Sequence, residues 1–142
     1  MLEYLLSLFP FYESRYVIPI LILKNRGLFD IIVVSFLNIL VFPIVIIFLD
    51  KVNPLFLKNH IYSKLYEKVV NYVSSKRYII EKYSYLGLFI LVFLPLPGTG
   101  VYTASILTWL LKLNRKKSII FISAGVLCIN LILYFFLEFL AR

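Results

Sequence analysis

Two oppositely charged side chains, Glu13 and Arg15, interrupt an otherwise apolar stretch from Tyr4 to Leu23. A charge at the bilayer centre costs about 2.5–3.5 kcal/mol, so such residues usually face a partner or a cavity. Arg15 stays charged at any relevant pH and can bind phosphate or carboxylate, whereas burial favours a protonated Glu13. The pair predicts a site for an anionic group, in which Glu13 carries a proton or balances Arg15 in the empty site. The alternative is a buried ion pair that only stabilises the fold.

A second candidate site is the turn Pro95–Gly100, with the sequence Pro-Leu-Pro-Gly-Thr-Gly. Glycine lets a ligand approach the backbone closely, and N–H groups in such a turn, and at the start of the helix after it, suit an anion. No Gly-Lys-Ser/Thr follows, which excludes a nucleotide-binding P-loop. The alternative is that these residues only cap and pack the turn. The candidate residues are Pro97, Gly98, Thr99, Gly100 and Thr103.

Residues typical of enzymes are scarce. A single cysteine, Cys128, and a single histidine, His60, exclude an internal disulfide and a cysteine or histidine metal cluster, and they argue against a Ser-His-Asp triad. The sequence also lacks paired carboxylates and any basic motif for nucleic acid. We therefore predict a protein that is not an enzyme, binds no nucleic acid and uses no cofactor, apart from proton coupling at Glu13.

The composition predicts a membrane protein. Of the 142 residues 62% are hydrophobic and 15% charged, whereas soluble domains are about half apolar and about a quarter charged. A spanning helix needs about 20 apolar residues. Residues 31–49 and 118–137 meet this requirement and are predicted to be transmembrane helices. The chain is thus expected to form one membrane domain, residues 1–142, that crosses the cell membrane more than once.

Residues 83–111 form a longer uncharged run that a single straight span does not explain. As one helix it would extend about 43 Å, well beyond the hydrocarbon core of about 30 Å. The positive-inside rule places the linker 51–82, with seven Lys or Arg, and the loop 112–117, with four, on the cytoplasmic side. The linker and the loop can both be cytoplasmic only if residues 83–111 enter the membrane and return to the same side. We therefore predict a re-entrant hairpin with its turn at Pro97–Gly100.

The same reasoning makes residues 4–23 a second hairpin, which enters from the opposite side; the alternative is one tilted span. The predicted fold is an all-α integral membrane protein, with two re-entrant hairpins and two transmembrane helices. Its first half is residues 1–50 and its second half is residues 83–142. These halves have opposite orientations, and such inverted repeats are typical of transporters.

The linker 51–82 predicts an amphipathic cytoplasmic helix between the halves. Ile61, Leu65, Val69 and Val73 recur at helical spacing, with tyrosines beside them and lysines largely elsewhere. A basic, tyrosine-rich helix of this kind suits the membrane surface. The alternative is that it docks on the cytoplasmic face of its own chain.

Two motifs resemble a known family. Glu13-Ser14-Arg15-Tyr16-Val17-Ile18-Pro19 and Pro95-Leu96-Pro97-Gly98-Thr99-Gly100 are similar to the motifs Glu-x-Arg-x-x-Ile-Pro and Pro-x-Pro-Gly-Thr-Gly of the small multidrug export proteins, which are related to the DedA and VTT membrane proteins. Relatives usually continue the second motif with Ala-Trp-Thr-Gly, where this chain has Val-Tyr-Thr-Ala. The resemblance implies paired re-entrant hairpins and transport of lipids such as polyprenyl phosphates. It also implies that Glu13 and Arg15 meet the Gly98–Gly100 turn near the midplane.

These observations together predict a membrane transport protein, either a small multidrug exporter or a lipid flippase of the polyprenyl-phosphate type. Its expected partners are membrane lipids and a small amphipathic or anionic substrate. A chain this small has little surface with which to enclose a pathway, so we also expect a homodimer or larger assembly. The alternative function is a non-transporting scaffold or assembly factor in which Glu13 and Arg15 form a structural pair.

Overall fold

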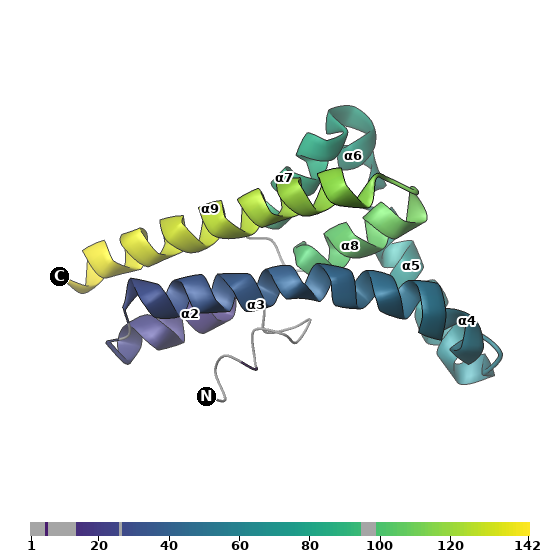
Figure 1. Cartoon of the computed structure of the whole chain (residues 1–142), viewed down its shortest axis with the longest axis horizontal. Helices are drawn as coiled ribbons and strands as arrows, with labels where there is room; N and C mark the ends of the chain where they lie inside the picture. Colours follow the sequence, from purple (N-terminus) through teal and green to yellow (C-terminus); the bar gives the residue numbers. More distant parts are fainter. Residues whose placement is uncertain (1–4, 6–13, 26, 95–98) are drawn as a thin grey trace.

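The computed structural model describes Leu5 and residues 14–25, 27–94 and 99–142, and of Ser14 and Arg15 only the backbone. Over these residues every regular element is helical, as the composition predicts (Figure 1). In chain order the elements are α2 (Ser14–Leu23), α3 (Leu28–Ile47), the π-helical turn η1 (Phe48–Val52), α4 (Asn53–Phe56), α5 (His60–Ser74), α6 (Arg77–Tyr83), α7 (Tyr85–Phe93), α8 (Val101–Leu110) and α9 (Arg115–Ala141).

Two long apolar helices, α3 and α9, form the axis of the molecule. They contact each other and run in opposite directions (Figure 1). The continuous helix of α3, η1 and α4 has a mean hydropathy of 3.0 in its most apolar window, and α9 has 2.5. Both are long and apolar enough to cross a membrane, and they contain the segments 31–49 and 118–137. The structure therefore confirms two candidate membrane spans where the sequence predicts them.

Shorter helices pack against opposite ends of this pair and form two apolar clusters. At one end α2 contacts α3 and α9; at the other end α7 contacts α9, and α8 contacts both long helices. The first cluster consists of Val17, Ile18, Leu21, Ile31 and Val34, with Leu133, Tyr134 and Leu137 packed against it. The second includes Val41, Phe42 and Ile46 of α3, Leu88, Leu91 and Val92 of α7, Val101, Ala104 and Leu107 of α8, and Ile122 and Val126 of α9.

The long uncharged run 83–111 is divided between α7 and α8. α7 ends at Phe93 and α8 begins at Val101, so the helix breaks where the prolines and glycines predict. α7 packs closely on α9 because Gly125 has no side chain. A Cβ atom there would lie 3.1 Å from the carbonyl oxygen of Phe89 and 3.1 Å from Cβ of Val92.

The linker between the halves is not one helix. α5 starts after Asn59, whose side-chain oxygen accepts a hydrogen bond from the Ile61 N–H at 2.9 Å. It ends at Ser74, after which the Ser75 hydroxyl bonds the carbonyl of Tyr72 at 2.5 Å. These side-chain bonds replace backbone bonds at both ends of α5. The apolar periodicity continues across the breaks, which is why the sequence pattern alone does not place them.

The predicted hairpin in residues 4–23 is described only in its second arm, α2, because its turn lies outside the described residues. The re-entrant arrangement and the inverted repeat stay predictions. What the structure provides is the arrangement of the short helices around the long pair.

Candidate functional site

A layer of buried polar side chains separates the two apolar clusters. Ser35 and Asn38 on α3 and Asn130 on α9 are all buried. The side-chain N–H of Asn130 donates to the hydroxyl oxygen of Ser35 at 2.8 Å, and that hydroxyl donates to the carbonyl of Ile31 at 2.8 Å. Buried polar groups are retained where they are hydrogen-bonded. We call Ser35, Asn38 and Asn130 the central polar layer.

The sequence indicated part of this layer. Asn38 and Asn130 lie one in each predicted span, where polar side chains are expected to bond between helices. The structure pairs Asn130 with Ser35. Serine is common in packed membrane helices and usually bonds its own helix, as Ser35 also does, so the sequence alone does not single it out.

Two short helices begin near this layer from opposite sides. A turn of a few residues joins α2 to the start of α3, and another joins α8 to the start of α9. Each short helix has ten residues and is about 15 Å long, half the length of α3 at about 30 Å. Both therefore begin near the middle of α3 (Figure 1). A helix N-terminus carries partial positive charge from its free N–H groups.

The residues just before α8 are held in a fixed conformation. Thr99 is buried, and its hydroxyl donates to the carbonyl of Leu94 at 2.9 Å, which closes the loop between α7 and α8. Gly100 has φ 153° and ψ −164°, a conformation that residues with a Cβ atom rarely adopt. Its carbonyl accepts the N–H of Ala104 at 2.9 Å. The Thr99 hydroxyl thus bonds the end of α7, and a binding role for Thr99 stays a prediction.

Hydroxyl groups continue along α8. Thr103 is buried in this helix. Ser105 and Thr108 are buried too and donate to the carbonyls of Val101 and Ala104, at 2.5 and 2.8 Å. These last two are satisfied within the helix, as is usual for such residues in an apolar environment. Thr103 thus lies in the helix that starts at the predicted turn, two residues after its first residue.

The charged part of the predicted site is only partly described. Glu13, Pro97 and Gly98 lie outside the described residues, and Arg15 is described only as a backbone position in the first turn of α2. That turn is the end of α2 nearer the middle of α3 (Figure 1). The roles predicted for these residues therefore stay predictions. Within the described ranges no group of three or more His, Cys, Asp or Glu residues could hold a metal ion.

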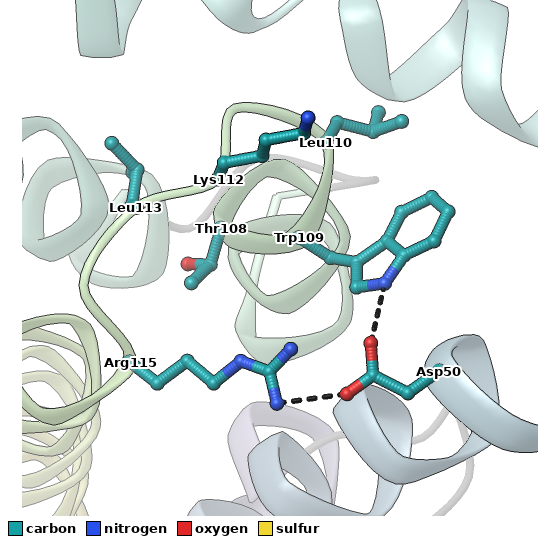
Figure 2. A pocket seen from close by; sticks show the side chains of 7 residues that line it. All are labelled: Asp50, Thr108, Trp109, Leu110, Lys112, Leu113 and Arg115. Carbon is teal, nitrogen blue, oxygen red and sulfur yellow. Dashed lines mark hydrogen bonds and ion pairs between the residues drawn. The ribbon is translucent and has the colours of Figure 1, made fainter.

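A cleft of about 450 Å³ with a mixed polar and apolar lining lies at the far end of the helix pair, where α3 ends and α9 begins. Figure 2 shows the Asp50 carboxylate between two donors: the indole N–H of Trp109 at 2.9 Å, and the Arg115 guanidinium at 2.8 Å. Thr108, Leu110, Lys112 and Leu113 complete the lining. From the sequence alone, Asp50 and Trp109 are two separate residues near the ends of apolar segments, with nothing to pair them. Asp50 directly follows the predicted span 31–49, and Arg115 precedes the predicted span 118–137. Their shared side of the membrane is the signal from which this contact could have been proposed.

Comparison with known proteins identifies one family model. The model described as "Putative small multi-drug export protein" matches residues 13–132, most of the chain. Neither the curated proteins nor the solved structures provide a match to this chain.

Proposed function

Because the chain belongs to the small multi-drug export protein family, we propose that it transports an amphipathic substrate with an anionic group across the membrane. The observation that supports this most is that α2 and α8 both begin near the middle of α3, from opposite ends, close to a buried polar layer between two long apolar helices. Broken helices that meet at mid-depth are the usual binding-site architecture of secondary transporters.

In this proposal α3 and α9 span the bilayer, and the short helices reach only half-way. α7 and α8 form a re-entrant hairpin from one face, and α2 is the second arm of a hairpin from the other. The Asp50 end is cytoplasmic, because the linker 51–82 carries seven Lys or Arg and the loop 112–117 carries four. The two halves then form an inverted repeat.

The proposed substrate binds with its anionic group in the central polar layer. The N-termini of α2 and α8 contribute partial positive charge, and Arg15, in the first turn of α2, contributes a full one. Glu13 balances Arg15 when the site is empty or carries a proton. Two helix N-termini and an arginine favour a lipid phosphate over a lipophilic cation. We therefore favour lipid-phosphate flipping over export of cationic drugs.

A flipping assay in proteoliposomes tests this function. The probe is a headgroup-labelled phosphate lipid, and a membrane-impermeant quencher reports which leaflet holds it. We expect wild type to expose the inner-leaflet label, whereas Glu13→Gln and Arg15→Gln lose this activity while remaining monodisperse by size exclusion. Glu138→Gln and Arg142→Gln are matched controls, because this exposed pair lies near the end of α9.

Three other results of the flipping assay would contradict parts of this proposal. If well-folded wild type moves no lipid, lipid flipping is wrong and proton-coupled drug uptake is the next assay. If Glu13→Gln and Arg15→Gln flip lipid at the wild-type rate, the proposed site is wrong. If these two variants instead lose their fold, the pair is structural, as in a membrane scaffold.

A further inference from the structure

Helix α5 has two apolar rows along its length, one largely buried and the other exposed. The inner row is Tyr62, Tyr66, Val70 and Val73, of which the first three are half-buried and Val73 is buried. The outer row is Ile61, Leu65, Val69 and Tyr72, with exposed fractions of 71%, 58%, 48% and 48%. Both rows follow the 3.6-residue period and lie about 100° apart around the helix.

The inner row fixes α5 on its own chain. The Tyr62 hydroxyl donates to the side-chain oxygen of Asn53 at 2.8 Å, and its ring lies 5.6 Å from that of Phe56. Burial raises the pKa of Tyr62 above its usual value. α5 also contacts α8. α5 is therefore docked on its own chain through this row, while the outer row stays exposed.

The charges near the outer row are mostly positive. Lys64 and Lys68 lie along its free edge, while Glu67 lies almost on the opposite side of the helix. The other Lys and Arg residues of the linker 51–82 and of the segment 112–117 are Lys51, Lys58, Lys76, Arg77, Lys82, Lys112, Arg115, Lys116 and Lys117. An anionic surface complements this region of the protein.

The position of α5 next to a candidate membrane span also favours a bilayer. α5 follows η1 and α4 at the end of the long apolar helix (Figure 1). The exposed apolar side chains of α3 continue into α4 through Ile44, Ile47 and Phe48 to Leu55 and Phe56. An apolar row with lysines at its edge, next to the end of a span, has the pattern of an interfacial helix.

We propose that the outer row of α5 inserts into the anionic leaflet of the membrane that the protein spans, with Lys64 and Lys68 on the lipid headgroups. This goes beyond transport, because it assigns a lipid-binding surface outside the proposed substrate site.

Single-cysteine labelling of the full-length protein tests the proposal. In a Cys128→Ser background, an environment-sensitive fluorophore is attached to Leu65→Cys on the outer row and to Glu67→Cys as the matched control. Both positions are exposed, so neither substitution disturbs packing. The protein is reconstituted in phosphatidylcholine bilayers with or without phosphatidylglycerol.

In phosphatidylglycerol bilayers we expect lipid-attached nitroxide to quench the label at 65, and aqueous iodide to quench only the label at 67. Lys64→Gln with Lys68→Gln should abolish the difference between anionic and neutral bilayers at position 65. Equal iodide access at 65 and 67 in anionic bilayers would overturn the proposal. So would protection of position 65 from both quenchers, because a second protein copy would then cover the row.

Discussion

At the scale of single residues, the close packing of neighbouring helices depends on glycines, which have no side chain. Gly87 in α7 lies against α6, where an added Cβ atom would come within 2.7 Å of the Ile79 carbonyl oxygen and 2.9 Å of Cα of Ile80. The neighbouring atoms are backbone atoms and cannot rotate away. By contrast, an added Cβ at Gly27 would meet nothing within 4 Å.

Gly87→Ser should therefore destabilise the protein, by about 1–3 kcal/mol as typical for overpacking. Gly27→Ser is the matched control and should be close to neutral, since serine is also a good N-cap residue for α3. Thermal unfolding in detergent, followed through the single tryptophan, Trp109, measures both. Equal unfolding temperatures for the two variants would contradict the packing of α6 on α7.

Much of the charged site could be proposed from the sequence, because a glutamate and an arginine within an apolar stretch are conspicuous. The bond between Asn130 and Ser35 could not be proposed in the same way. It depends on the rotation of α3 and α9 about their axes, which apolar periodicity does not determine when both helices are apolar on every face.

At the scale of elements, the break of the run 83–111 into α7 and α8 follows from its prolines and glycines, and the sequence predicts it. The divided linker was not predicted. Asn59 begins α5 and Ser75 ends it through local side-chain bonds, and both residue types are also tolerated on exposed helix surfaces. The sequence alone also does not divide the apolar residues of α5 into an inner and an outer row. That division depends on which neighbouring helices cover α5.

The cleft at Asp50 links elements far apart in the chain. The carboxylate joins η1 to α8 through Trp109 and to α9 through Arg115. The side chains of Arg115 and Asp50 are 56% and 33% exposed, so solvent screens their attraction and we expect a coupling of about 0.2–1 kcal/mol. This coupling should weaken with added salt.

A double-mutant cycle of Asp50→Asn and Arg115→Gln measures that coupling from the unfolding free energies. Asp50→Asn keeps an oxygen for the Trp109 N–H, which isolates the ion pair. Glu138→Gln with Arg142→Gln provides the comparison cycle for an exposed pair within one helix, 3.4 Å apart. Strictly additive effects at Asp50 and Arg115 would show that the contact contributes nothing to stability.

At the scale of the whole molecule, two short helical units pack on opposite ends of one antiparallel helix pair. Much of the outward surface of that pair is apolar, for example Phe36 and Ile44 on α3 and Phe135 and Phe136 on α9. Lipid or a second copy of the chain can cover such a surface, so the predicted homodimer stays a prediction. The proposed membrane topology depends instead on whether the start of α7 and the end of α8 lie on the same side of the membrane.

The most direct test of this account is cysteine accessibility to an impermeant maleimide, before and after cell permeabilisation, in a Cys128→Ser background. Lys82→Cys lies before α7, Lys116→Cys lies after α8, and Gly27→Cys lies between α2 and α3. We predict that positions 82 and 116 react from the same side, the cytoplasm, and that position 27 reacts from the other. Labelling of 82 and 116 from opposite sides would make α7 and α8 one complete span and would contradict the account.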